Sequence, residues 1–310
     1  MFIINHKNIF FAISAMFVVF SVFAIFFWGL NPSIEFTGGS IIEITFPDGR
    51  PDTSELSSMI AEEFPGNVFV QPTGEFGYII RMRELGVEEH PLLLETVSRQ
   101  GAKKIVEERY NLIGPSIGKE LRMKAFIAIG IVLAGIILFI AFAFRGVSRG
   151  SVESVSRGVS SWHYGFAAIV ALVHDVIIPT GIFSFLGSRF VDAQIDVLFV
   201  TALLAILGYS VHDTIVVFDR VRENLRKNQE FKLRTTFEET VGESLMQTMG
   251  RSINTSLTTL LALLALYFLG SEATKNFALV LSIGIIVGTY SSIFLASPLL
   301  VALAQMRRKP

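Results

Sequence analysis

The residues most able to do chemistry in this sequence are ionisable side chains inside long apolar stretches. His174 and Asp175 lie near the middle of the stretch 165–186, and Asp213 lies five residues before the end of the stretch 197–218. An ionisable side chain inside a membrane helix costs at least ~2.5–3.5 kcal/mol, so each one needs a functional or structural reason. These three residues are therefore candidates for binding or passing protons.

Arg251 and Thr255 add a basic group and a hydroxyl group to this set. Arg251 directly precedes the apolar stretch 252–269, and Thr255 follows one helical turn later on the same face. We expect Arg251 to lie at a similar depth to Asp213. A carboxylate that alternates between an arginine and a proton is the basic part of a proton relay. A buried pair that only locks two helices together, and a histidine that only bonds a neighbouring helix, stay open as alternatives.

The same residue types do not indicate an enzyme or a metal site. The chain has no cysteine, which excludes thiolate ligands and disulfides. An intramembrane aspartyl protease could use Asp175 and Asp213 as a pair, but their positions predict different depths, and the sequence around Asp213 lacks the glycine-aspartate pattern of such enzymes. We expect no catalytic residue, no metal and no cofactor.

Six apolar stretches must position these residues. The chain has 310 residues, of which 51% are hydrophobic and only 17% charged, whereas a soluble domain is usually about 25% charged. A helix needs about 20 apolar residues to cross a membrane. We predict such helices at 9–30, 125–144, 165–186, 197–218, 252–269 and 277–303. The net charge of −1 argues against a nucleic-acid partner.

Lysine and arginine in the loops predict the orientation of these helices, because short cytoplasmic loops are enriched in them. They gather near both chain ends and at 145–157 and 220–234. The opposite short loops hold only Arg189 and Lys275. We therefore expect both termini in the cytoplasm and residues 31–124 on the outer side.

The segment 31–122 has the pattern of a small α+β domain. Asp52, followed by Glu55 three residues later, resembles a capping box at the start of a helix. Alternation of apolar residues and turn signals predict the other elements. We expect strands at 40–46, 78–82 and 106–112, and helices at 52–65 and 91–100.

The predicted fold is an all-α bundle of six transmembrane helices, with a small α+β extracytoplasmic domain between the first two. Residues 1–30 form the N-terminus and first helix, and 123–144 the second. The Ser/Gly/Arg-rich segment 145–163 is expected to be a flexible, basic cytoplasmic linker. Residues 164–310 hold helices three to six, with a cytoplasmic loop at 219–250.

Gly284 and Gly288 form a small-xxx-small pair in the last apolar stretch. Such pairs let two membrane helices approach closely. We expect these glycines to serve helix packing.

The sequence also contains several longer motifs around these residues and elsewhere in the chain. They are IEFTGG (34–39), IGPSIG (113–118), HDV (174–176), GYSVHDTIVVFDRVREN (208–224), RSINTSLTTLL (251–261) and GTYSSIFLASPL, which begins at Gly288. In this order they resemble the SecF family of protein-export membrane subunits. The sequence departs from the family at His212, where the family usually has Asn, and at Glu35, where it typically has Asp.

The resemblance implies a function that composition does not show. It implies an auxiliary subunit that works with SecD, uses the proton motive force and promotes export of unfolded preproteins through the SecY channel. Asp213, Arg251 and Thr255 match the family's proton-path positions one by one. The expected place is the bacterial cytoplasmic (inner) membrane, in contact with lipid.

A proton-driven exporter of small molecules or lipids, from the same superfamily, is the alternative. Such an exporter would need a larger outer domain with a substrate vestibule, and usually twelve membrane helices. Six helices suggest half of a pseudo-symmetric unit, which favours a subunit that requires a partner.

Overall fold

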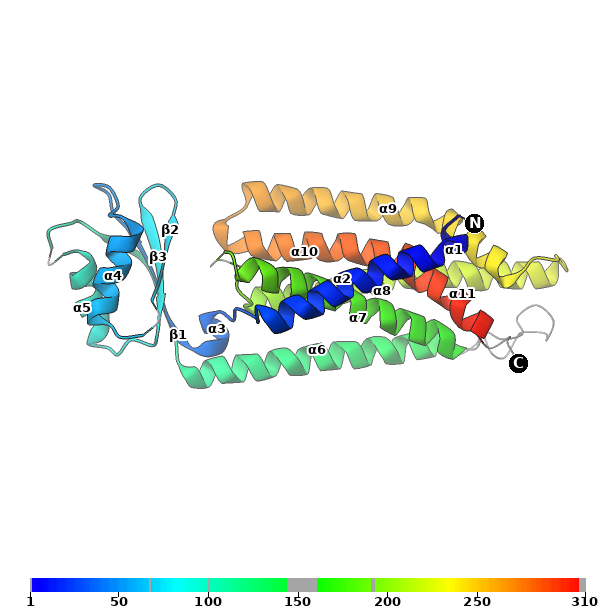
Figure 1. Ribbon diagram of the computed structural model, residues 1–310, viewed down its shortest axis with the longest axis horizontal. Coiled ribbons are helices and arrows are strands. Elements are labelled where there is room, and N and C mark those ends of the chain that lie inside the picture. Colours follow the sequence, from blue (N-terminus) through cyan, green and yellow to red (C-terminus); the bar gives the residue numbers. More distant parts are fainter. Residues whose placement is uncertain (1, 67, 100, 144–160, 191–192, 307–310) are drawn as a thin grey trace. The chain divides into compact units, whose positions relative to one another are not determined.

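The structure is a computed structural model, and it describes residues 2–66, 68–99, 101–143, 161–190 and 193–306. The chain divides into two compact units (Figure 1). The helical unit contains residues 1–30, 128–186 and 198–310. The sheet unit contains residues 31–127 and 187–197.

Six helices in the described ranges are long and apolar enough to cross a membrane. They are α2 (Lys7–Phe27), α6 (Pro115–Ala143), α7 (Ser161–Gly187), α8 (Val197–Glu230), α9 (Phe237–Leu269) and a last helix made of α10 (Glu272–Tyr290), the π-helix η1 (Ser291–Ala296) and α11 (Ser297–Met306). A short helix, α1 (Phe2–Asn5), precedes them. The predicted number of membrane helices is confirmed.

The helix boundaries differ from the prediction in three places. The second membrane helix begins at Pro115, not at residue 123. The third begins at Ser161, so the last three residues of the predicted linker are helical, and residues 144–160 lie outside the described ranges. The predicted loop at 219–250 is wrong, because α8 continues to Glu230 and α9 begins at Phe237. Hydropathy marks only the part of a helix that lies in the membrane, and a helix continues beyond it wherever local bonds and packing allow.

Local bonds explain why α8 and α9 extend so far. Thr236 and Glu239 form a capping box that begins α9, with the Glu239 amide 3.2 Å from the Thr236 hydroxyl and the Thr236 amide 2.7 Å from the Glu239 carboxylate. The two helices are also joined by buried polar contacts, from Asn224 to Ser244 at 2.9 Å and from Asn228 to Thr240 at 3.0 Å.

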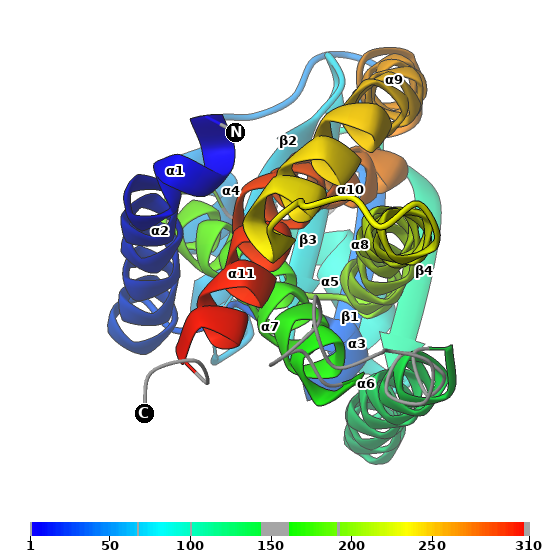
Figure 2. The ribbon, with the colours of Figure 1, turned by 90° about the vertical axis from the view of Figure 1, so that its right-hand side faces the viewer.

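Burial is concentrated in α7, α8 and the α10–α11 helix of the helical unit, which Figure 2 shows approximately end-on. Within the apolar windows, 56% of residues are buried in α7, 50% in α8 and 56% in the α10–α11 helix. The corresponding shares are 17% in α2, 6% in α6 and 11% in α9. The outer helices therefore leave apolar surface for lipid or another protein.

The sheet unit holds a four-stranded antiparallel sheet in the order β2-β3-β1-β4. Its strands are β1 (Gly39–Thr45), β2 (Phe69–Thr73), β3 (Gly77–Met82) and β4 (Val106–Ile113). Helices α4 (Thr53–Glu63) and α5 (Glu89–Val97) cover one face, as Figure 1 shows, and α3 (Ile34–Thr37) precedes β1. The core between sheet and helices contains Ile42, Ile44, Phe46, Leu56, Ile60, Tyr78, Ile80 and Leu93.

The small α+β domain between the first two membrane helices agrees with the prediction, with two differences. Strand β2 was not predicted, because Pro72 in its middle has no N–H to donate; β2 is an edge strand, where a proline is tolerated. Asp52 caps α4 by accepting the Ser54 amide at 2.8 Å, but Glu55 does not complete a capping box and instead forms an ion pair with Arg99.

Candidate functional site

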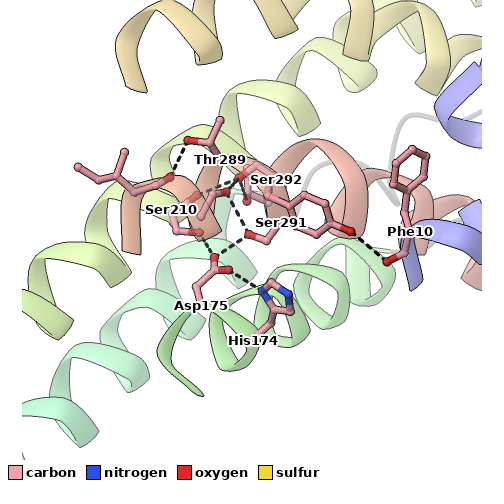
Figure 3. Close-up of polar contacts among 11 residues, drawn as sticks. Phe10, His174, Asp175, Ser210, Thr289, Ser291 and Ser292 are labelled. Carbon is pink, nitrogen blue, oxygen red and sulfur yellow. Dashed lines mark hydrogen bonds and ion pairs between the residues drawn. The ribbon is translucent and has the colours of Figure 1, made fainter. Parts of the chain in front are cut away.

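Asp175 of α7 is fully buried and holds three hydrogen-bonding neighbours (Figure 3). Its Oδ2 accepts the hydroxyl of Ser210 from α8 and, at 2.7 Å, the hydroxyl of Ser291 from η1. Its Oδ1 lies 2.8 Å from Nδ1 of His174. One carboxylate thus connects the three central elements of the bundle.

His174 is almost as deeply buried, with 4% of its side chain exposed. Its ring stacks near Tyr290, with the ring centroids 6.2 Å apart. The Tyr290 hydroxyl donates to the carbonyl of Phe10 in α2 at 3.1 Å. Within the described ranges, Nε2 of His174 has no hydrogen-bond partner.

The π-helix at Ser291 follows from the local sequence. Pro298 has no amide hydrogen, and its ring would clash with the carbonyl four residues earlier in a regular α-helix. A wider turn before the proline removes this conflict, and serine hydroxyls donate to backbone carbonyls in and before this turn. The Ser297 hydroxyl donates to the Ser292 carbonyl at 3.0 Å, and the Ser292 hydroxyl donates to the Gly288 carbonyl at 2.9 Å. π-helical turns often occur at functional sites.

Asp213 of α8 forms a second buried carboxylate site. Its side chain is 6% exposed, and Oδ1 accepts the Ser252 hydroxyl of α9 at 2.9 Å. In the part of the chain that the structure describes, the buried Oδ2 has no partner. Next along α9, Ser256 lies 3.0 Å from the Tyr209 hydroxyl and 2.6 Å from the Thr289 hydroxyl. Hydroxyl groups therefore line the contact between α8, α9 and α10.

The structure does not join Arg251 and Thr255 to this site. Both side chains are exposed on α9, and among the described residues no ion pair connects Arg251 with Asp213. Adjacent helical residues project about 100° apart. The buried face of α9 carries Ser252 and Ser256 instead.

Sequence reasoning therefore missed Ser210, Ser252 and Ser291. It compared the depths of Arg251 and Asp213 but did not establish which face of α9 meets α8. The four-residue spacing of Ser252 and Ser256, a small-xxx-small pattern, was the available signal for the buried face of α9.

Gly284 and Gly288 lie against α8. A Cβ atom on Gly284 would lie 2.1 Å from Cδ1 of Ile206, and one on Gly288 would lie 3.1 Å from Cβ of Ser210. Gly288 thus lets α10 approach α8 where Ser210 binds Asp175.

Chemically, this arrangement can hold protons on buried carboxyl and imidazole groups. In the described ranges no group of three or more His, Cys, Asp or Glu side chains could hold a metal ion. The hydroxyl groups around the two carboxylates can both donate and accept hydrogen bonds, which suits proton transfer.

Comparison with known families identifies the relatives of this bundle. The family described as "Protein export membrane protein SecD/SecF, C-terminal" matches residues 94–156 and 158–306, and the "SecD/SecF GG Motif" matches residues 23–46. The chain belongs to the SecD/SecF family.

Curated SecD/SecF relatives match nearly the whole chain. A protein translocase subunit SecF from Thermobaculum terrenum is 39% identical over 97% of this chain and 93% of its own length. The SecF subunit from Haemophilus influenzae is 35% identical over 92% of this chain and 80% of its own length. The SecDF subunit from Thermus thermophilus is 36% identical over 92% of this chain, which spans only 36% of that longer protein.

Solved SecDF structures have the same fold. The crystal structure of Thermus thermophilus SecDF, described as a translocon-associated membrane protein, has a TM-score of 0.79 at 33% identity. A SecDF structure in a super-membrane-facing form has a TM-score of 0.65. This chain spans 38% of each of those chains.

The SecD/SecF GG motif lies beside the start of α6, within the sheet unit. Gly38 has a φ of 80°, and a Cβ there would lie 2.8 Å from Cα of Pro115. In the same segment, Glu35 accepts the Val197 amide at the start of α8 at 2.8 Å, and the Ser33 amide donates to the Ile195 carbonyl at 2.9 Å. Within the sheet unit, the segment before β1 is thus bonded to the loop that leads into α8.

Proposed function

We propose that this chain is a SecF subunit that works with SecD and uses the proton motive force to promote preprotein export through the SecY channel. Family membership supports this proposal, and so does the Thermus thermophilus relative, whose name joins SecD and SecF. The exposed apolar faces of α6 and α9 offer surface for a partner subunit and lipid. The proposed location is the bacterial cytoplasmic membrane, with both termini in the cytoplasm.

The observation that carries the proton-driven part is the buried Oδ2 of Asp213, which has no hydrogen-bond partner among the residues that the structure describes. A buried carboxylate oxygen without a donor is costly while ionised, and a proton removes that cost. Each charge that crosses the membrane releases about 2.3 kcal/mol per 100 mV. A few protons per cycle are enough to shift a conformational equilibrium.

Arg251 and Thr255 remain proton-path candidates in this proposal. Because they lie on the exposed face of α9, we propose that a change in α9 or a partner subunit brings Arg251 and Asp213 together during the cycle. Arg251→Lys keeps the charge but loses the planar guanidinium, so we expect it to reduce export.

The test is export into membrane vesicles that contain this chain, SecD and the SecY channel, with and without a proton gradient. Asp213→Asn should fold and insert normally but lose the gradient-stimulated part of export. Asp219→Asn is the matched control, because Asp219 lies on the same helix with an exposed side chain. Full gradient stimulation in Asp213→Asn would refute a proton role for Asp213. Loss of the protein itself would instead indicate that the carboxylate only holds the helices together.

A further inference from the structure

We propose that His174 is a second proton-binding residue of the bundle, that its Nε2 takes the proton, and that Asp175 passes the change to the π-helix η1. This inference rests on the proposed proton-driven function. It is carried by the hydrogen bonds of the two side chains and by a buried ring nitrogen that has no partner within the described ranges.

The tautomer of His174 follows from its bond to Asp175 when Asp175 is ionised. Asp175 faces two hydroxyls on Oδ2 and the His174 ring on Oδ1. An ionised carboxylate only accepts hydrogen bonds, so Nδ1 of His174 must be the donor. In a neutral imidazole the other nitrogen, Nε2, then carries a free lone pair. That atom is buried and without a partner among the described residues.

Charge balance gives this lone pair a role. Ionised Asp175 beside a neutral His174 leaves one buried negative charge, which is costly in an apolar bundle. Among the described residues, the pair has hydrogen bonds with the hydroxyls of Ser210 and Ser291, and the ring of Tyr290 lies beside His174. None of these three is basic. Asp213, the nearest acidic residue along α8, bonds Ser252 on α9 instead. A proton on Nε2 would convert the pair into an imidazolium–carboxylate pair without net charge.

Ser291 connects this event to the π-helix. Its hydroxyl lies 2.7 Å from Asp175 Oδ2 and 3.0 Å from the Gly288 carbonyl. Figure 3 shows Ser291 and Asp175 facing each other. A hydroxyl has one hydrogen, so it donates fully to only one of these acceptors. When His174 becomes cationic, Asp175 shifts its charge toward Oδ1, and the Ser291 hydroxyl turns toward Gly288. Ser291 is the first residue of η1. The rotation of its hydroxyl therefore changes the hydrogen bonds of the segment that leads to α11.

His174→Asn separates a proton-binding role from a structural one. The asparagine amide can take the place of Nδ1 and keep the bond to Asp175, but it has no Nε2 and does not titrate. His163→Gln is the matched control, because His163 lies near the start of the same helix and outside the site. Both variants should insert and co-purify with SecD as the wild type does.

The first measurement is gradient-stimulated export in vesicles that contain SecD and the SecY channel. We expect the gradient stimulation of export to be at least tenfold weaker in His174→Asn than in the wild type, and unchanged in His163→Gln. Full stimulation in His174→Asn would overturn this inference but leave the proposed function intact. Absence of gradient stimulation in the wild type would refute the proposed function itself.

The second measurement remains decisive if His174→Asn fails to fold. Nitrogen-15 NMR of histidine-labelled wild-type chain in lipid nanodiscs distinguishes protonated from unprotonated Nε2. We expect the resonance that is missing in His174→Gln to move between these two positions as the pH changes. A His174 ring that keeps one state across the pH range of export would exclude Nε2 as the proton acceptor.

Discussion

Replacement of Gly181 by alanine tests how α2 is held against the central helices. A Cβ atom at Gly181 of α7 would lie 2.3 Å from Cβ and 2.4 Å from Cα of Ser21 in α2. Ordinary carbon contacts begin at 3.4 Å, so the two backbones must separate by about 1 Å, and overpacking of this kind costs about 1–3 kcal/mol. Apart from Ser21, only Ser14 and Ala24 of α2 are buried. α2 therefore has few other buried residues that could compensate for the lost packing against α7.

The matched control is Gly135→Ala in α6. A Cβ there would meet no atom within 4 Å. Alanine favours a helix over glycine by up to about 1 kcal/mol at both positions. The difference between the two variants therefore isolates the clash, and we expect Gly181→Ala to be less stable than Gly135→Ala by about 1–3 kcal/mol.

The assay is reversible unfolding of each variant in mixed detergent and SDS, followed by circular dichroism. The expected result is an earlier transition for Gly181→Ala and an unchanged or later one for Gly135→Ala. Equal transitions in the two variants would show that α2 is free to move away from α7, and the packing argument would be wrong.

Three further predictions concern the sheet unit and the orientation of the chain. Residues 33–115 expressed alone should give a soluble domain with dispersed amide resonances, because α4, α5 and the sheet enclose their own core; a disordered spectrum would mean that the core needs another chain or the membrane. In that domain Arg83 holds the pKa of Glu89 down to about 2 through hydrogen bonds of 2.9 and 2.6 Å. This lowered pKa stabilises the domain above about pH 4.5 and is lost as the pH falls toward 2. Urea unfolding should therefore show Glu89→Gln less stable than wild type at pH 7, with the gap closing near pH 2; a gap independent of pH would contradict the pairing. A topology reporter at residue 230 should give a cytoplasmic signal and one at residue 70 an outer signal, and a cytoplasmic signal at residue 70 would reverse the proposed orientation.

The membrane helices could be predicted from the sequence because each contains a long uncharged or nearly uncharged run. Their ends could not, because they depend on contacts rather than hydropathy. The extension of α8 to Glu230 depends on buried asparagines that bond α9, as Asn228 does with Thr240. Strand β2 escaped prediction for a related reason, since only its edge position makes Pro72 acceptable.

The burial of the two carboxylates was predictable, but the helix faces that they meet were not. Asp175 and Asp213 could be found because buried carboxylates are rare in membrane helices. The face of α9 that meets Asp213 could not be assigned from depth alone, and Ser252 occupies it rather than Arg251. The π-helix also lay beyond prediction, because it results from Pro298 together with serine hydroxyls that bond specific carbonyls.

The π-helix has a consequence for how this chain tolerates changes in length. A π-helical turn is a single-turn widening of an α-helix and holds one residue more than the α-helical turn it replaces. Deletion of a single residue such as Ile293 would remove this extra residue and keep the present faces of α10 and α11, although Pro298 would again press on the carbonyl four residues before it. The same deletion in the middle of α8 would rotate every later residue of that helix by about 100° and remove its buried face from the core. Residues 291–296 are thus a place in the helical unit where the chain can lose a residue without losing the packing on either side.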